Sequence, residues 1–103
     1  MKVYIAGKVS GLPRDEINRK FDESAKMLVE QGHEPFNPTV LPDYEDVPHD
    51  DYMHVCYAMI DICDAVYMQK DWQSSKGARL ERQYAFDWEK RIIYEDPATK
   101  EDF

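Results

Sequence analysis

One glutamate stands out among the side chains that could do chemistry. Glu81 repeats with Ala78, Ala85 and Trp88 at spacings of three and four residues, so a carboxylate shares a helical stripe with small and aromatic side chains. Burial raises the pKa of a carboxylate, whereas the positive end of a helix lowers it, and such opposed effects are common at active sites. A working carboxylate is therefore one interpretation of Glu81. The plain structural alternative is an ion pair with Arg79, Arg82 or Lys8.

The turn before Glu81's helix carries groups suited to an anion. Ser74 or Ser75 can cap the helix start, where backbone N–H groups, hydroxyls and the Lys76 ammonium would converge on a negative charge. Trp72 either stacks on a base or covers the end of a sheet. For the two serines, capping alone is the simpler interpretation.

A second candidate for anion binding is the loop at residues 6–11, which places two glycines, a lysine and a serine directly after an apolar run. Its backbone N–H groups could approach a phosphate or a sugar. The loop lacks the third glycine of the dinucleotide fingerprint and the closing Gly-Lys-Ser/Thr of a Walker loop. A plain tight turn is the alternative, and Tyr4 just before it is interpreted as core.

These side chains need strands and helices to position them, and the sequence alternates between the two. Four segments are predicted as strands, the second of them at a sheet edge because prolines interrupt it: residues 2–6, 33–38, 64–68 and 91–94. Three segments are predicted as helices from their periodicity and end signals: residues 13–32, 50 or 51 to 63, and 76–90. Residues 38–51, rich in Pro and Asp, are expected to form one loop.

This alternation predicts an α/β fold, a three-layer doubly wound parallel sheet of about four or five strands, Rossmann/flavodoxin-like. Ligands of such sheets lie beyond the carboxyl ends of the strands. The loops after Ala6, Asn37 and Met68 are therefore the places to look for a site. We expect one domain over residues 1–94, followed over residues 95–103 by a polar C-terminal tail or a short docking segment.

Composition excludes several classes of function. The chain has 103 residues with 13 Lys plus Arg against 21 Asp plus Glu, a net charge of −8, and the basic residues are dispersed. A nucleic-acid polymer would meet a repulsive field, whereas a small anion in a local pocket is compatible with this balance. No window approaches a membrane span, and the first residues do not form a signal peptide. We expect a cytoplasmic protein without membrane contact.

Cys56 and Cys63 are expected to be free and buried. On one helix about 10 Å of rise separates them, which is too far for a disulfide. We expect neither a metal nor a cofactor, because three histidines lack zinc-ligand spacing: His33, His49 and His54. Asp61 shares a solvated helix face with His54, and Asp64 is expected to form structural hydrogen bonds at a helix-to-strand junction.

Four segments together resemble the nucleoside 2-deoxyribosyltransferase superfamily over nearly the whole domain. They read MKVYIAG at 1–7, GHEPFNP at 32–38, DAVYM at 64–68 and GARLERQYA at 77–85, followed by two isoleucines at 92–93. The turn WQSSKGA at 72–78 and the tripeptide CDA at 63–65 are most similar to a subgroup of small bacterial and phage domains of unassigned function.

The resemblance implies roles for three residues. Glu81 falls on the glutamate that attacks the anomeric carbon of a 2-deoxyribosyl group, a step that suits a carboxylate because the sugar passes through an oxocarbenium-like state. Ser75 falls where the transferases carry an Asp for the 5′-hydroxyl and a related 5′-monophosphate N-glycosidase carries a Ser, which favours a nucleotide. Cys56 replaces the Asp that protonates the departing base. The resemblance also implies a homo-oligomer, since a neighbouring subunit completes each site.

Our leading hypothesis is a (deoxy)nucleotide-binding N-glycosidase or 2-deoxyribosyltransferase-like enzyme, with Glu81 and Cys56 as catalytic residues. The expected substrate-binding residues are Tyr4 and Gly7 at the sugar, Ser10, Ser75 and Lys76 at the phosphate, Trp72 at the entrance, and the loop glycines Gly11 and Gly77. The alternative is a catalytically impaired nucleotide sensor or accessory protein of the same fold. A purely structural subunit is the third possibility.

Overall fold

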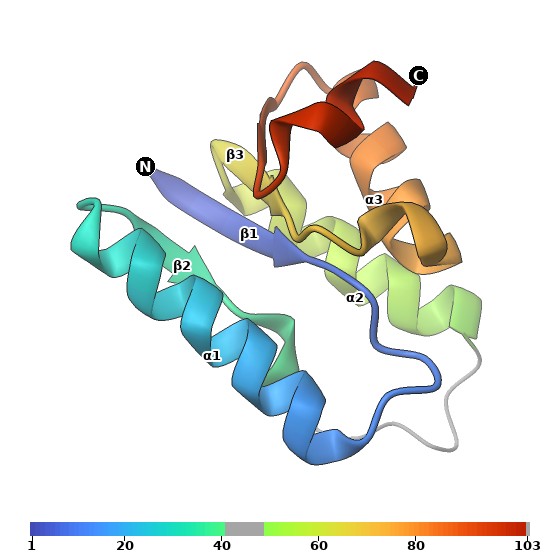
Figure 1. Cartoon of the computed structure of the whole chain (residues 1–103). Helices are drawn as coiled ribbons and strands as arrows, with labels where there is room; N and C mark the ends of the chain where they lie inside the picture. The colour runs from blue at the N-terminus through green and yellow to red at the C-terminus, as the bar shows by residue number, and fades with distance from the viewer. Residues whose placement is uncertain (41–48, 103) are drawn as a thin grey trace.

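The computed structural model describes residues 1–40 and 49–102, and its strands form one parallel sheet (Figure 1). The strands are β1 (Lys2–Ala6), β2 (Glu34–Phe36), β3 (Ala65–Met68) and β4 (Arg91–Tyr94). They lie in the order β2-β1-β3-β4, and every neighbouring pair is parallel. The predicted parallel α/β sheet is confirmed, with β2 at an edge as its prolines indicated.

Three layers form because helices cover both faces of this sheet. The α-helices of the described chain are α1 (Arg14–Glu30), α2 (His49–Ile62) and α3 (Lys76–Asp87). Side chains alternate along β1, so Val3 and Ile5 pack with α1 while Tyr4 and Ala6 pack with α2 and α3. Figure 1 shows α1 on one side of the sheet and α2 and α3 on the other. The three-layer arrangement predicted from the sequence is therefore confirmed.

Helix boundaries differ from the predictions at two places. The second helix begins at His49, slightly before the expected capping aspartates. The structure describes the first part of the expected loop as a 3-10 turn, η1 (Pro38–Val40). Residues 41–48 lie outside the described chain. The third helix ends at Asp87 instead of Lys90, because Glu89 adopts a left-handed φ of 59°. Trp88 is thus a capping residue with 64% of its surface exposed, and it does not share the buried stripe of Glu81.

The central pair β1 and β3 is the point where the connections diverge, which is where α/β sheets bind ligands. From β1 the chain passes through α1 to β2 at one edge, and from β3 it passes through α3 to β4 at the other. Gly7 follows β1 and Gln69 follows β3, and the Gln69 N–H donates to the Ala6 carbonyl at 2.9 Å. The two loops therefore start side by side.

Gly7 is required at this point because Gln69 occupies the space of a side chain. A Cβ on Gly7 would lie 1.9 Å from the Gln69 Oε1 and 3.0 Å from its Cβ. Gln69 is 1% exposed, and its Nε2 donates to the Lys20 carbonyl at 3.1 Å and to the Ser24 Oγ at 2.9 Å. The amide cannot move aside without breaking these bonds.

We expect Gly7→Ala to lower the free energy of unfolding by about 2 kcal/mol, the usual cost of inserting a methyl group into a packed site. Urea unfolding followed by circular dichroism measures the change. In a Gln69→Ala background the same substitution should cost much less, because the clashing side chain is gone. An equal cost in the two backgrounds would show that Gln69 is not the reason for the glycine.

The C-terminal residues pack against the domain. Residues Pro97–Asp102 form a 3-10 helix, η3, drawn in red in Figure 1, which contacts β4. Thr99 is buried, and its Oγ1 accepts a hydrogen bond from the Trp72 Nε1 at 2.9 Å. Glu95 accepts one from the Lys70 N–H at 2.9 Å. Of the two interpretations of this segment, a polar tail and a short docking segment, the contacts fit the second, because the segment covers the turn that precedes α3.

Candidate active site

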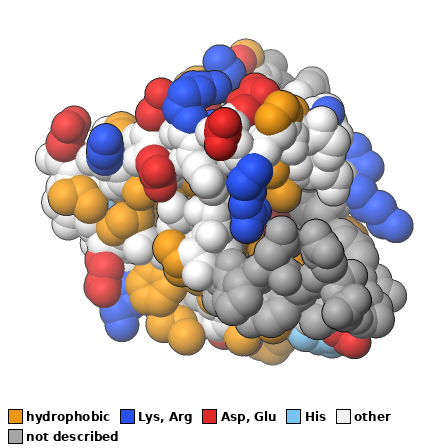
Figure 2. Space-filling view, turned by 90° about the horizontal axis from the view of Figure 1, so that it is seen from below, with side chains coloured by type: hydrophobic (Ala, Val, Ile, Leu, Met, Phe, Trp, Pro, Cys, Tyr) orange, Lys and Arg blue, Asp and Glu red, His pale blue; other side chains and the backbone are white. Residues whose placement is uncertain are grey.

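A cavity of about 580 Å³ opens at the carboxyl end of β1. Its described walls come from β1 and the loop that follows it, the first turns of α1, η1, α2, the turn that leads into α3, and α3 itself. The surface seen in Figure 2 carries acidic and basic side chains intermixed with hydrophobic ones, with no extended patch of one sign among the described residues. The volume suits a small-molecule ligand.

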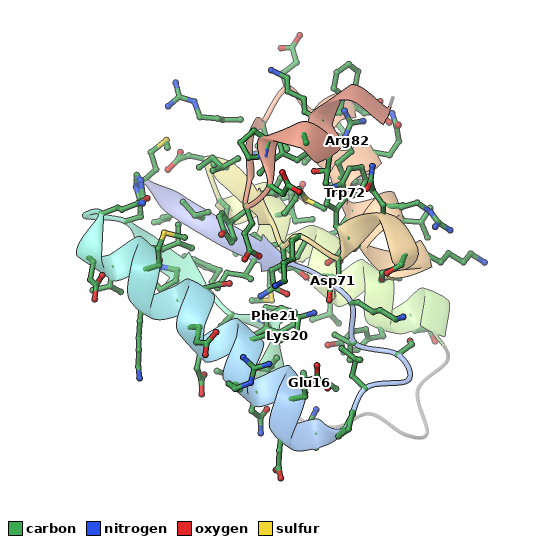
Figure 3. The ribbon with its side chains drawn as sticks, viewed as in Figure 1. Glu16, Lys20, Phe21, Asp71, Trp72 and Arg82 are labelled. Atoms are coloured by element: carbon green, nitrogen blue, oxygen red, sulfur yellow. The ribbon has the colours of Figure 1, made fainter. Side chains whose placement is uncertain are left out.

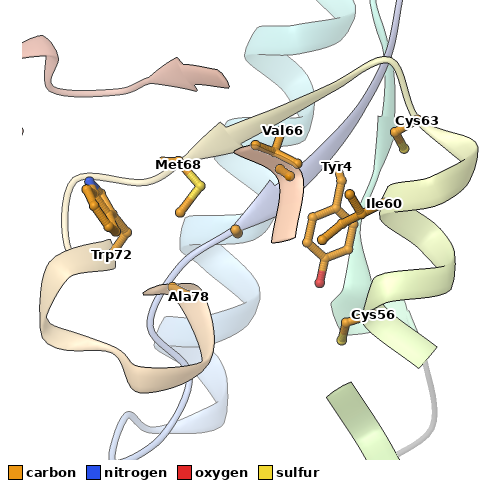
Figure 4. Close-up of a cluster of buried hydrophobic side chains, with 10 residues drawn as sticks. Tyr4, Cys56, Ile60, Cys63, Val66, Met68, Trp72 and Ala78 are labelled. Carbon is orange, nitrogen blue, oxygen red and sulfur yellow. The ribbon is translucent and has the colours of Figure 1, made fainter. Parts of the chain in front are cut away.

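Glu81 reaches this cavity from the α3 wall. Only 6% of its surface is exposed, and the Tyr4 hydroxyl donates a short hydrogen bond to its Oε2. The Cys56 thiol forms a second side-chain hydrogen bond with the carboxyl group. Figure 4 shows the Tyr4 ring crossing the core from β1, with its hydroxyl near Cys56 on α2. Three elements therefore hold one buried carboxyl group in place.

The arginines that were alternative partners of Glu81 have other hydrogen bonds. Arg79 donates to the Gln73 carbonyl at 2.7 Å, and the Arg82 Nε donates to the Tyr94 hydroxyl at 3.2 Å. The hydrogen bonds that the structure gives to the carboxyl group come from a phenol and a thiol instead. Its hydrogen-bond partners are therefore polar and uncharged, which suits a carboxyl group that reacts.

Burial sets the protonation of this cluster. It raises the pKa of Glu81 from 4.5 to about 7, while the hydrogen bonds from Tyr4 and Cys56 act in the opposite direction. Burial also raises the pKa of Cys56 to about 11, with a further contribution from the Glu81 charge, and it raises that of Tyr4 well above 10. Near neutral pH, Glu81 titrates while the thiol and the phenol keep their protons.

Tyr52 is a cavity residue that the sequence analysis missed. It lies one helical turn before Cys56 on α2, is half-buried, and shares a side-chain hydrogen bond with the Cys56 thiol. Burial raises the pKa of its hydroxyl to about 12. The spacing of four residues between Tyr52 and Cys56 was the available signal, because such pairs face the same way on a helix.

Ser75 is the residue that caps α3. Its Oγ accepts from the Ala78 N–H at 3.1 Å, whereas the Ser74 Oγ donates to the Asp71 carbonyl at 2.8 Å. The first turn of α3, with its positive partial charge, therefore faces the cavity together with a hydroxyl.

The cavity brings together most of the residues that the sequence pointed to. Six of the eight expected substrate-binding residues line it, namely Tyr4, Gly7, Ser10, Ser75, Lys76 and Gly77. Lys8 and Arg14 line it as well and were not assigned to the ligand. With Lys76, they place three cationic side chains around a space that a phosphate could enter.

Trp72 and Gly11 are not among the described lining residues of the cavity. Trp72 does not stand at an entrance: its side chain is fully buried, bonded to Thr99 and tilted against the Tyr94 ring at 6.0 Å. Figure 4 shows it beside Met68, at the opposite end of the hydrophobic cluster from Tyr4. Gly11 is exposed and turns the chain with a φ of 83°. Trp72 therefore covers the sheet end, the second of the two interpretations.

The remaining sequence candidates have structural surroundings. Cys56 and Cys63 are free and buried, as predicted. Asp64 accepts from the Lys2 N–H at 3.0 Å, which confirms its structural role, and the exposed Asp61 accepts from the Tyr84 hydroxyl at 2.6 Å.

The described residues contain neither a cluster of metal-ligating side chains nor a helix suited to a membrane. Over residues 1–40 and 49–102, the structure holds no group of three or more His, Cys, Asp or Glu side chains placed to bind a metal ion. Within the same ranges, no helix has the length and hydrophobicity that a bilayer crossing requires.

Two solved structures share the fold. A 2-deoxyribosyltransferase from Leishmania mexicana superposes with a TM-score of 0.69 at 21% identity, over 90% of this chain and 62% of that one. A CMP N-glycosidase from Clostridium botulinum superposes with a TM-score of 0.61 at 19% identity, over 91% of this chain and 67% of that one. This chain thus spans about three fifths of the length of the transferase.

Sequence comparison places the chain in a family. No curated protein sequence matches it significantly. Residues 1–94 match the model of a family described as a domain of unknown function, DUF4406. The match covers β1 to β4 and ends before η3. The chain therefore belongs to the DUF4406 family, and its fold is that of the nucleoside 2-deoxyribosyltransferase-like proteins.

Proposed function

We propose that this protein binds a (deoxy)nucleotide and cleaves or transfers its base–sugar bond with Glu81 as the nucleophile. One observation carries the proposal: a buried carboxyl group, held by a phenol and a thiol, faces a cavity large enough for a nucleotide. The two similar structures support the same chemistry, since one is named a 2-deoxyribosyltransferase and the other a CMP N-glycosidase.

The proposed reaction proceeds in two steps. A Glu81 oxygen bonds to the anomeric carbon while the carbon–nitrogen bond to the base breaks, and the bonding electrons leave with the base. The departing nitrogen takes the proton of the Cys56 thiol. In the second step, water or another base attacks the glycosyl ester and frees the Glu81 carboxylate. In both cases the attacking group, water or the second base, gives its proton to the Cys56 sulfur, so the protein is regenerated.

The charge of the cavity favours a phosphorylated substrate. In this proposal Lys8, Lys76 and the hydroxyls of Ser10 and Ser75 bind the 5′-phosphate at the start of α3. Tyr4 and Gly7 then lie beside the sugar. A carboxylate at the position of Ser75 would repel a phosphate, whereas a hydroxyl accepts a hydrogen bond from it or donates one.

The test combines binding with turnover. The full chain is heated with CMP, dCMP, dTMP, dAMP, dGMP and the matching nucleosides, and ligands that raise the melting temperature are then incubated with the protein while free base is measured by chromatography. We expect at least one monophosphate to stabilise the protein more than its nucleoside and to release its base. Saturation at 100 times Kd would add about 2.7 kcal/mol of stability.

The other outcomes identify the alternatives. Stabilisation without base release would show that the protein is a nucleotide sensor and not an enzyme. No observation on the described residues favours the sensor over the enzyme. No stabilisation by any member of the panel would overturn nucleotide binding. Assembly into a homodimer or larger and a cytoplasmic location stay predictions, and light scattering that finds only a 12.2 kDa species would remove the first.

A further inference from the structure

A closed ring of hydrogen bonds holds the Lys8 peptide group at the edge of the cavity. The Lys8 N–H donates to the Asp71 Oδ1 at 3.1 Å, and the Asp71 Oδ2 accepts from the Lys20 Nζ at 2.7 Å. The same Nζ donates to the Lys8 carbonyl at 2.6 Å, which closes the ring. Figure 3 shows Lys20 on α1 and Asp71 in the turn after β3 close together.

The Lys20 side chain of the ring is largely buried and shielded from water. The Lys20 side chain is 14% exposed and that of Asp71 is 30% exposed. Charge-assisted bonds in such surroundings are shorter and stronger than neutral ones. The Lys20 carbonyl also accepts from the Gln69 Nε2 at 3.1 Å, so α1 is fastened to the end of β3 next to the ring. No local pattern in the sequence indicates this contact, because Lys20 and Asp71 are 51 residues apart.

The ring acts on the cavity only through the Lys8 backbone. Gly7, Lys8, Val9 and Ser10 line the cavity, whereas Lys20 and Asp71 are absent from its described lining and border a separate hollow of about 330 Å³. Neither of their side chains is thus placed to touch a ligand in the main cavity. What they fix is the path of the chain that does.

We propose that Lys20 and Asp71 are positioning residues, which hold residues 7–10 in the shape that receives the ligand. The effect on ligand affinity rests on the proposed function, whereas the ordering of residues 7–10 by the two side chains does not. An ordinary ion pair between α1 and the turn after β3 would need only opposite charges. The ring needs, in addition, a donor for the Lys8 carbonyl and an acceptor for the Lys8 N–H.

Variants of the full chain separate these two roles. Lys20→Met removes the donor. The charge swap Lys20→Asp with Asp71→Lys keeps opposite charges but puts an ammonium donor where the Lys8 N–H needs an acceptor and a carboxylate where the Lys8 carbonyl needs a donor. Arg19→Met is the matched control. Arg19 precedes Lys20 on the same helix, and the substitution breaks only an exposed ion pair with Glu23 at 3.3 Å. Urea unfolding establishes that each variant is folded.

Two measurements follow for each folded variant: hydrogen exchange of the backbone amides by mass spectrometry, and the affinity for CMP and dCMP by calorimetry. In Lys20→Met we expect amide exchange over residues 8–12 to accelerate about tenfold or more, with the rest of the sheet within about twofold, and binding to weaken about tenfold. The charge swap should behave like Lys20→Met, and Arg19→Met like the parent.

Three results would overturn the inference. Parent-like exchange over residues 8–12 in Lys20→Met would show that the ring does not hold the loop. Restoration by the charge swap would reduce the ring to an ordinary ion pair. Faster exchange with unchanged affinity would separate the loop from ligand binding. If the parent binds neither CMP nor dCMP, the proposed function is what fails, and the exchange rates still decide whether the ring holds the loop.

Discussion

Replacing Glu81 by glutamine is expected to abolish base release while leaving nucleotide affinity within about fivefold of the parent. Glutamine keeps the size of the side chain and an oxygen that accepts from the Tyr4 hydroxyl. It has no negative charge, so it can neither stabilise an oxocarbenium-like sugar nor bond to the anomeric carbon. The loss of a nucleophile lowers kcat by about 10³-fold or more in comparable cases. Chromatography of the released base and calorimetry with the bound nucleotide measure the two quantities.

Glu89→Gln is the control for this experiment. It makes the same change of charge just beyond α3, at an exposed position, and should release base like the parent. Glu81→Gln protein that turned over at the rate of the parent would remove the assigned nucleophile. A variant that lost binding together with turnover would show that the Glu81 carboxylate acts mainly in holding the ligand.

The same substitution is expected to stabilise the protein at alkaline pH. The pKa of Glu81 is raised from 4.5 to about 7, so the folded chain keeps a proton that the unfolded chain releases between these values. The fold therefore loses stability as pH rises from about 4.5 to about 7, and above that range the whole penalty, about 3 kcal/mol, applies. Glutamine stays neutral and carries no such penalty.

Thermal unfolding of the parent and Glu81→Gln between pH 4 and pH 8.5 measures this effect as a difference, in which the other titrating groups cancel. The variant should match the parent near pH 4 and melt roughly 15 °C higher at pH 8. A constant gap over the whole range would mean that packing, rather than the charge of a buried carboxylate, separates the two proteins. A gap that opened toward acid pH would contradict the direction of the pKa shift.

Most of the fold could be predicted because its signals are local. Apolar runs mark β1, which Gly7 closes, and β3, which a turn follows. The periodicity of Ile17 and Phe21 marks α1, which packs both of them against the sheet. The end of α3 could not be predicted. It depends on Glu89 in a left-handed conformation, where the sequence offers neither a glycine nor an asparagine.

In the candidate site, too, residues with a local sequence signal could be predicted, and residues that depend on distant contacts could not. Glu81 and Ser75 were found from helix position, and Ser75 caps the helix as expected. The burial of Trp72 could not be predicted, because its indole bonds to Thr99, which lies 27 residues later, and no local pattern indicates that contact. Lys20 and Asp71 were missed for a similar reason, since each residue alone has the properties of an ordinary surface charge. Only the fold makes them neighbours.

The short edge strand β2 limits how copies of this protein can meet. The Glu34 N–H points inward and donates to the Met1 carbonyl at 2.9 Å, so the next position along the strand turns its backbone outward. That position is Pro35, which has no N–H. Within β2 the outer rim thus offers no N–H donor to an incoming strand, which disfavours continuing the sheet there into a neighbouring molecule. Assembly through helical surfaces, loops or the opposite rim is favoured instead.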